Sequence, residues 1–185
     1  MSTLPDNAIA PYGMWLNVQN RAYGAATMHL CTGYATSMPA IVIGADTPQG
    51  VRILEALANR EGDLRAFVST PEARAELVAK GIRAANGDVS DGTHVGSAAI
   101  GAFCAVCIST ATHDDRERSF ASTPAAVVSQ WAEGLKDAGV RRIIWVSCDD
   151  VDGSPLSQIG ATFVSVDFDD TTPGAILDLV DADTL

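Results

Sequence analysis

The sequence predicts an open α/β sheet of parallel strands with helices packed on both faces, all within a single domain. Short apolar runs alternate along the chain with longer stretches in which apolar residues recur at helical spacing. The runs are apolar almost without interruption, as in AIVI at 40–43, which is typical of strands that are buried on both faces. Because parallel neighbours need crossover connections, we expect a doubly wound sheet in three layers.

Each element is predicted from its local pattern. Six strands are expected at 40–43, 64–68, 82–85, 103–108, 142–146 and 162–166. Helices are expected at 49–60, 71–80, 89–100 and 123–138, and a short closing helix at 173–180. The helix at 71–80 has the clearest ends, because Pro71 and Glu72 suit a first turn. Gly81 then follows at the position where this helix should stop.

Composition and charge exclude several classes of function. A chain of 185 residues is long enough to bury a core, and its net charge is −11. Lys80 and Lys136 are the only lysines, and every charged residue after Arg142 is an aspartate, which predicts a solvated acidic surface. Nucleic-acid binding is not expected, because it requires clustered positive charge. No apolar run is long enough to span a membrane and the N-terminus lacks a signal-peptide pattern, so we expect a cytoplasmic protein.

Residues 1–37 show no helical or strand period and do not join the alternation. Met38 directly precedes the first predicted strand, so the domain is expected to comprise residues 38–185. The first 37 residues are interpreted as a disordered arm, as an arm that docks on a partner, or as sequence upstream of the true start. A chain that begins at Met38 is expected to fold.

The cysteines and one acidic turn carry motifs that invite a metal or redox interpretation. Cys104 and Cys107 form a C-x-x-C, but they lie within a predicted strand, where residues three apart point to opposite faces. We therefore expect buried core thiols, and no disulfide framework. The stretch DVDG at 150–153 resembles part of a calcium loop but lacks the closing glutamate, so an ordinary acidic turn is expected.

The stretch GADTPQG at 44–50 joins the first predicted strand to the first helix. A dinucleotide-binding loop needs glycines for its tight turn, for close approach of the pyrophosphate, and for packing of helix on strand. Gly44 and Gly50 meet the first and third requirements, whereas Thr47 and Pro48 stand where the middle glycine is expected. The loop is either a weakened phosphate site, in which the Thr47 hydroxyl replaces one donor, or only a sharp corner.

Further motifs connect this loop with a known family. GADTPQG is followed by DLRAFVSTPEARAELVAKGIRAANGDVSD, by GAFCAVCIST and by LKDAGVRRIIWVSCD. In their order and spacing these pieces resemble the NmrA-like branch of the atypical short-chain dehydrogenase/reductase family, over roughly residues 38–150. The resemblance implies a Rossmann fold that binds NAD(P), with strand order 3-2-1-4-5-6.

The resemblance also implies roles for individual residues. In the family the first loop holds the pyrophosphate, the end of the second strand meets the adenosine ribose or its 2′-phosphate, the G-D-[VL] motif borders the adenine, and the end of the fourth strand approaches the nicotinamide ribose. The corresponding residues are Gly44, Asp46, Thr47, Pro48, Gln49 and Gly50 for the loop, Ser69 and Thr70 for the adenosine ribose, Asp88 and Val89 for the adenine, and Ser109 and Thr110 for the nicotinamide ribose. The alternative for these polar residues is simple capping of strand ends.

The choice between NADP and NAD is left open by the sequence. Relatives that favour NADP commonly have an arginine where this chain has Ser69, and Arg74 could replace it. No acid occurs at the end of the second predicted strand to bind both ribose hydroxyls or to repel a 2′-phosphate. These features together slightly favour NADP(H).

Catalytic residues of the family are missing. Active members pair a tyrosine with a lysine four residues later, but every tyrosine here precedes Met38. Ser147 occupies the position of the catalytic serine and is interpreted as a polar strand end. His113, Asp114 and Asp115 follow the fourth strand, where a histidine could donate a proton, although a solvated loop is the simpler interpretation. Few residues follow Val166, where relatives add a substrate-binding lobe.

Three functions remain, in this order. The first is a redox-sensing or regulatory binder of NAD(P) without a catalytic dyad of its own. The second is a small NAD(P)H-dependent oxidoreductase, in which the cofactor supplies the hydride and water supplies the proton. The third is a degenerate fold kept as a structural or interaction subunit, with the N-terminal arm as its docking element. No metal site is predicted.

Overall fold

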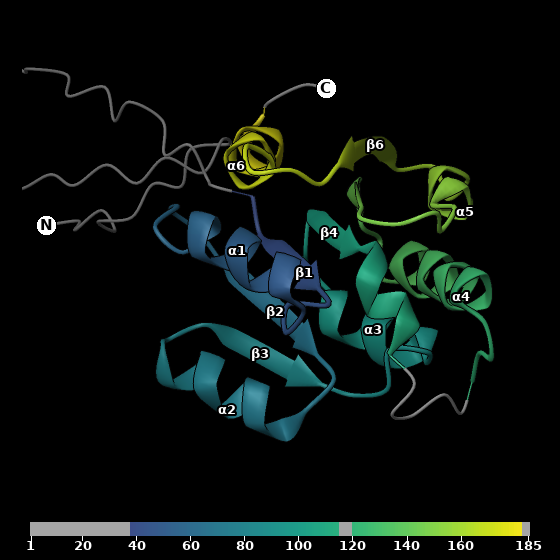
Figure 1. Cartoon of the computed structure of the whole chain (residues 1–185), viewed down its shortest axis with the longest axis horizontal. Helices are drawn as coiled ribbons and strands as arrows, with labels where there is room; N and C mark the ends of the chain where they lie inside the picture. Colours follow the sequence, from purple (N-terminus) through teal and green to yellow (C-terminus); the bar gives the residue numbers. More distant parts are fainter. Residues whose placement is uncertain (1–37, 115–119, 183–185) are drawn as a thin grey trace, which may run out of the picture. The chain divides into compact units, whose positions relative to one another are not determined.

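The fold is a six-stranded parallel sheet in the order β3-β2-β1-β4-β5-β6, as a computed structural model shows for residues 38–114 and 120–182 (Figure 1). The predicted strand order is therefore confirmed, and β1 lies between β2 and β4. The strands are β1 (Ala40–Ile43), β2 (Leu64–Val68), β3 (Arg83–Asn86), β4 (Cys104–Ile108), β5 (Arg142–Ser147) and β6 (Thr162–Asp167). The predicted arm at residues 1–37 lies outside the described residues, as does Asp115.

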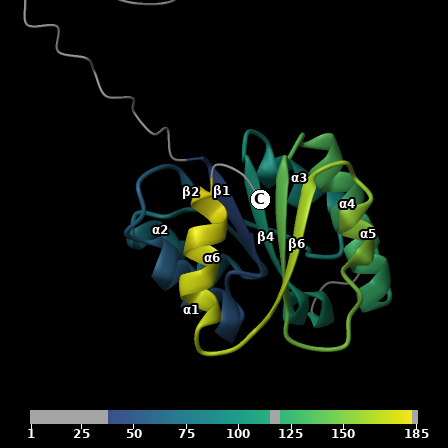
Figure 2. The same ribbon diagram turned by 90° about the horizontal axis from the view of Figure 1, so that it is seen from above.

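Helices cover both faces of the sheet. They are α1 (Pro48–Leu57), α2 (Pro71–Ala79), α3 (Gly92–Ala99), α4 (Pro124–Asp137), α5 (Ser154–Ser157) and α6 (Thr172–Asp181). Figure 2 shows α1, α2 and α6 on one side of the sheet, and α3, α4 and α5 on the other. The predicted three-layer, doubly wound architecture is confirmed. Within the described part of the chain, no helix combines the length and hydropathy that a membrane span requires.

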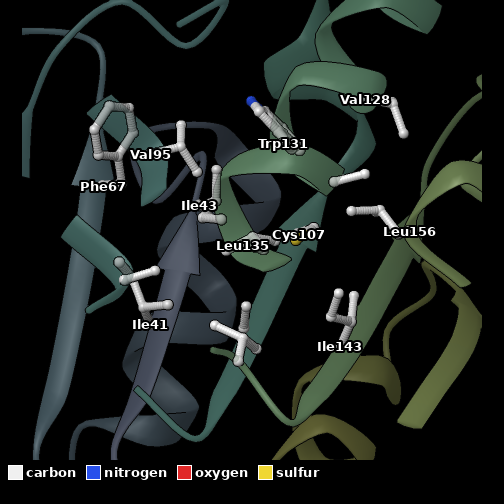
Figure 3. Packing of buried hydrophobic residues seen from close by; sticks show 14 of the residues in the cluster. Ile41, Ile43, Phe67, Val95, Cys107, Val128, Trp131, Leu135, Ile143 and Leu156 are labelled. Atoms are coloured by element: carbon white, nitrogen blue, oxygen red, sulfur yellow. The ribbon is translucent and has the colours of Figure 1, made fainter. Parts of the chain in front are cut away.

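Alternation along β1 divides the core into two clusters. Ile41 and Ile43 belong to the cluster that includes Val95 of α3 and Trp131 of α4 (Figure 3), whereas Ala40 and Val42 belong to the cluster that includes residues of α1 and α6. All four residues of β1 are fully buried, which agrees with an apolar strand that is covered on both faces.

The C-x-x-C motif is part of this core. Cys107 belongs to the cluster under α3 and α4, and Cys104 belongs to the opposite cluster, so the two sulfur atoms point away from each other. Burial raises the pKa of the Cys104 thiol to about 12 and raises the pKa of the Cys107 thiol as well. Both cysteines are therefore unreactive core residues, as the sequence predicted.

Local capping explains where the structure departs from the predicted boundaries. The third helix begins at Gly92 rather than at residue 89, because the Asp91 carboxylate accepts hydrogen bonds from the Thr93 and His94 amides and caps the helix there. Two short elements were not predicted at all: α5 and a 3₁₀ helix, η1 (Ser109–His113), directly after β4. The 3₁₀ helix replaces the loop that was expected over the site.

We propose that the folding unit begins at Met38, because Met38 and Pro39, the first described residues, already hydrogen-bond to the rest of the domain. The Met38 carbonyl accepts a hydrogen bond from Arg60 Nη2 at 2.8 Å, and the Pro39 carbonyl accepts from the amides of Phe103 and Cys104. A chain that begins at Met38 is expected to keep cooperative thermal unfolding, measured by circular dichroism. A chain that begins at Gly44 and lacks β1 is the control that should not fold. Loss of cooperativity in the Met38 chain would show that residues 1–37 belong to the core.

Candidate functional site

A pocket of about 300 Å³ lies where the carboxyl ends of β1, β2 and β4 meet. The chain turns from β1 toward β2 on one side and reaches β4 on the other, so this is the point at which the strand order reverses. Open α/β sheets bind ligands at such a point. The described residues that line the pocket come from the loop after β1, the end of β2, and the segment after β4: Asp46, Thr47, Ser69, Thr110, Ala111, His113 and Asp114.

The two glycines of the loop let α1 approach the end of β1. Gly44 has a φ of +82°, a conformation that suits glycine. A Cβ at Gly50 would lie 2.8 Å from Ala45 Cα and even closer to the Gly44 carbonyl oxygen, so no side chain fits between the helix and the loop. The tight turn and the close helix–strand packing expected of these two positions are both present.

Thr47 holds the loop closed with its side chain. It is the N-cap residue of α1, and its Oγ1 accepts a hydrogen bond from the Gly50 amide at 3.0 Å. The same hydroxyl donates to the Gly44 carbonyl at 2.7 Å. The sequence suggested that this hydroxyl could serve as a phosphate donor, but in the structure both of its hydrogen-bonding roles are used within the loop.

Most amides of the loop also have partners inside the protein. The Gly44 and Ala45 amides both donate to the Phe67 carbonyl of β2 at 3.1 Å, and Pro48 has no amide hydrogen. The Gln49 amide, at the second position of α1, has no acceptor among the described residues. Gln49 Oε1 accepts from Thr110 Oγ1 at 3.2 Å and so ties α1 to η1. The Gln49 amide is therefore a donor that the helix start offers to a bound anion.

An acid lies at the end of β2, although no acid occurs there in the sequence. Asp46 Oδ2 accepts a hydrogen bond from the Ser69 amide at 2.9 Å. The carboxylate comes from the loop after β1, and the parallel pairing of Ile43 with Phe67 brings that loop beside the end of β2. Asp46 was predicted to belong to the phosphate loop, but its contact with Ser69 could not be seen from sequence spacing.

The residues predicted to meet the adenosine ribose are not all in the pocket. Ser69 lines it, whereas Thr70 caps α2 by accepting a hydrogen bond from the Ala73 amide at 3.2 Å. Arg74 Nε donates to the Ala84 carbonyl of β3 at 3.1 Å. The Arg74 side chain is thus held against β3 and is not among the lining residues.

The predicted adenine residues form a separate turn after β3. The Asp88 carboxylate accepts from the Ser90 amide at 2.7 Å and from the Ser90 hydroxyl at 2.6 Å. The Val89 carbonyl accepts from Trp131 Nε1 of α4 at 2.6 Å. Neither Asp88 nor Val89 lines the pocket, so this turn is defined in the structure by packing against α4.

At the end of β4, one predicted residue joins two strand ends and the other lines the pocket. Ser109 is fully buried, and its Oγ accepts from the Cys148 amide at 2.9 Å, which joins the ends of β4 and β5. This is the strand-end role that the sequence left as an alternative. Thr110 lines the pocket and contacts Gln49.

A histidine–aspartate pair borders the same pocket. His113 Nε2 of η1 lies 3.2 Å from Asp149 Oδ2, which follows β5, and the histidine side chain is 52% exposed. The other carboxylate oxygen, Asp149 Oδ1, accepts from the Val151 amide at 3.2 Å, so the carboxylate is oriented by the backbone. Sequence reasoning placed His113 near the site but did not identify Asp149 as its partner, because only the pairing of β4 with β5 brings them together.

Comparison with known proteins places this fold. The chain is similar to the NADPH-dependent quinone oxidoreductase QOR2 of Escherichia coli in complex with NADPH, at 20% identity and a TM-score of 0.55, over 68% of this chain and 47% of that chain. It is similar to NmrA, a negative transcriptional regulator in complex with NADP, at 17% identity and a TM-score of 0.54, over 71% of this chain and 45% of that chain. It is also similar to a wide-type short-chain dehydrogenase/reductase of Veillonella parvula in complex with NADP, at 10% identity and a TM-score of 0.59, over 80% and 89%.

These likenesses establish the Rossmann-like fold. The matched part spans about half the length of QOR2 and NmrA. A comparison with curated proteins found no match in sequence. Residues 44–167, which run from the first glycine of the loop to the end of β6, match the family described as NAD(P)H-binding. The chain therefore belongs to the NAD(P)H-binding family.

Proposed function

We propose that this chain is a cytoplasmic, redox-sensing or regulatory binder of NADP(H) or NAD(H) without a catalytic dyad of its own. The observation that carries the proposal is the pocket at the ends of β1, β2 and β4, which has the glycine-bounded helix start of a dinucleotide site. From Met38 onward the sequence has no tyrosine to serve as the family's proton donor. The described cysteines are free thiols, which suits a reducing compartment. Residues 1–37 are our candidate for docking on a partner.

The residues present fit a dinucleotide at this edge. The Gln49 amide and the positive end of α1 would hold a phosphate oxygen, and the absence of a Cβ at Gly50 lets the helix start come close. Ser69 would meet the adenosine ribose, and Thr110 would lie toward the nicotinamide end. The cofactor, when bound, would supply a transferable hydride, while these residues bind and orient it.

We expect weak binding. Thr47 and Pro48 together remove two of the donors that such a loop normally offers, since one amide is capped and the other is missing. Each unmatched donor costs about 1–3 kcal/mol, so the affinity is expected to fall roughly ten- to a hundredfold for each lost contact. Titration of the full chain with NADPH and with NADH, followed by calorimetry and by nicotinamide fluorescence, measures it.

Replacement of Thr47 by glycine is expected to tighten dinucleotide binding about tenfold, because it uncaps the Gly50 amide and removes the branched side chain beside it. The cost to stability should be only a few tenths of a kcal/mol, since glycine is tolerated at a helix N-cap. Calorimetry of both nucleotides and urea unfolding give the two numbers.

Two matched variants show whether the capped Gly50 amide or the branched side chain of Thr47 weakens dinucleotide binding. Thr47→Ala uncaps the amide but keeps Cβ, and Thr47→Ser keeps the cap but removes the methyl group. If the wild-type chain and Thr47→Gly both bind neither nucleotide at millimolar concentration, the loop is only a corner. The structural-subunit function would then replace the present proposal.

The His113–Asp149 pair favours a second candidate function, a small NAD(P)H-dependent reductase. His113 can give a proton to the oxygen of a substrate that takes a hydride from the reduced cofactor, while the contact with Asp149 orients the imidazole ring. A quinone is a suitable trial substrate, because the E. coli neighbour is a quinone oxidoreductase.

If the chain is a reductase that uses this pair, His113→Gln is expected to lower kcat for quinone reduction by about 10²–10⁴-fold, with binding of NADPH unchanged. Asp149→Asn should have a smaller effect. Absorbance of NADPH at neutral pH follows turnover. An unchanged rate in His113→Gln would assign the proton to water, and no turnover in the wild type would leave the regulatory function.

A further inference from the structure

We propose that the groove between α1 and α2 binds an amphipathic helix of a partner protein, one that carries lysine or arginine beside its apolar face. The two helices lie on the same side of the sheet (Figure 2), and the groove is lined by their facing sides and by the loops at their ends. It shares one described lining residue, Asp46, with the nucleotide pocket. The partner helix is thus distinct from the nucleotide, and the inference does not depend on nucleotide binding.

The length of the groove suits a short helix. The groove has a volume of about 500 Å³ and extends from Ala45, which follows β1 after one glycine, to Asp63, directly before β2. Because β1 and β2 are parallel, these two residues lie at opposite edges of the sheet, so the groove runs along α1. The ten residues of α1 span about 15 Å, which corresponds to about three turns of a partner helix.

Apolar side chains line both walls of the groove at helical spacing. Val51, Leu54 and Ala58 follow α1 to its C-cap at positions i, i+3 and i+7, and Ala73 and Leu77 lie on α2 at positions i and i+4. Such rows leave a furrow into which the apolar row of a third helix can insert. Helices that bind in grooves are anchored by residues at the same spacing.

The domain leaves α2 only partly covered. None of the nine residues of α2 is buried, whereas α1 buries four of its ten residues. Val51, on the α1 wall of the groove, is exposed as well. A helix that lies in the groove would remove apolar surface of both walls from water, which provides a driving force for association.

Two carboxylates on the walls select a basic partner. Glu55 of α1 and Glu76 of α2 both line the groove. Neither side chain has a hydrogen-bond or ion-pair partner in the described part of the chain. A lysine or arginine beside the apolar row of the partner helix can therefore pair with a carboxylate on either wall.

The basic side chains of the groove do not offset these two acids. Arg83 is paired with Asp63, and Arg60 is paired with Asp181 of α6. Lys80, at the C-cap of α2, forms no ion pair with a described residue. The net charge of −11 also attracts a basic partner over a longer distance, and it disfavours nucleic acids and anionic membranes.

Two synthetic peptides test the inference. Both are labelled with fluorescein, have about 14 residues and carry leucines at helical spacing, and they differ in whether lysines or glutamates stand beside the leucine row. Fluorescence anisotropy measures their binding to the full chain. We expect saturable binding of the lysine peptide, roughly tenfold or more tighter than binding of the glutamate peptide.

Variants of α2 show where the lysine peptide binds. Glu76→Lys should weaken its binding roughly fivefold or more, whereas Glu72→Lys makes the same change of charge outside the groove and should alter binding less than about twofold. Ala73→Phe fills the groove and should weaken binding roughly tenfold, whereas Ala75→Phe, at an exposed position that does not line the groove, should have little effect. Circular dichroism should show that all four variants are folded.

Each outcome decides for or against the groove. Equal affinity for the two peptides, or equal losses in Glu76→Lys and Glu72→Lys, would assign binding to the overall charge and overturn the inference. No binding of the lysine peptide at millimolar concentration would overturn it too. If sedimentation velocity shows a dimer that Ala73→Phe abolishes and Ala75→Phe preserves, the groove binds a second copy of this chain and the inference is wrong. Failure of the nucleotide titration, with peptide binding as expected, would refute only the proposed function.

Discussion

Replacement of Gly50 by valine is expected to abolish dinucleotide binding and to destabilise the domain by about 3 kcal/mol, near the upper end of the usual cost of overpacking. A Cβ at this position would lie 2.8 Å from Ala45 Cα and 2.9 Å from the Ala45 carbonyl carbon. Both are backbone atoms of the loop after β1, so neither can rotate away. The first turn of α1 must move, and the free Gln49 amide moves with it. Urea unfolding and calorimetry measure the two effects.

Gly174 provides a matched control for this prediction. It lies in the first turn of α6, and a Cβ there meets no atom within 4 Å. Gly174→Val should therefore leave binding unchanged and alter stability by less than about 1 kcal/mol, which reflects helix propensity alone. Equal loss of stability in the two variants would show that the close approach of α1 to the loop is not what Gly50 provides.

Truncation of Trp131 to alanine is expected to cost about 3–5 kcal/mol of the free energy of unfolding. The side chain is fully buried between α4 and the sheet, beside Val95 and Leu135 (Figure 3). Its Nε1 also donates to the Val89 carbonyl at 2.6 Å, so the truncation leaves both a cavity and a carbonyl without its donor. Because Val89 belongs to the turn after β3, the loss should also loosen that turn.

Two further variants separate the cost of the lost hydrogen bond from the cost of the cavity. Trp131→Phe keeps most of the ring volume and removes the hydrogen bond, so it should cost about 1–3 kcal/mol. Phe120→Ala truncates an aromatic side chain that is 60% exposed, and should change stability by less than about 0.5 kcal/mol. Urea unfolding curves that place Trp131→Ala within 1 kcal/mol of Phe120→Ala would contradict the assigned role of Trp131 in the core.

Local signals explain how much of the fold could be predicted. The bounds of β1 and β2 agree with the prediction because each strand is followed directly by a residue that breaks its pattern, Gly44 after β1 and Ser69 after β2. The helix at 71–80 was predicted from its ends, although α2 has no buried residue and thus no apolar face to reveal it. Its Thr70 cap and the φ of +83° at Gly81 show why those ends were sufficient. The short α5 has a proline in its first turn, but it has no side-chain cap and its four residues are too few to show a helical period, so it was missed.

The candidate site also has features that the sequence predicted and contacts that only the structure shows. By itself, the sequence determined the strand–loop–helix unit and the roles of its two glycines. Both the tight turn and the close approach of the helix depend only on residues that are adjacent in the chain. Only the tertiary structure decided that Asp46 contacts Ser69, that His113 contacts Asp149, and that Arg74 lies against β3. The physical reason is that parallel pairing aligns the ends of strands that are far apart in the chain. A side chain's partners across that edge depend on the register of the strands and on the geometry of the loops. Neither produces a periodic pattern in the sequence from which it could be predicted.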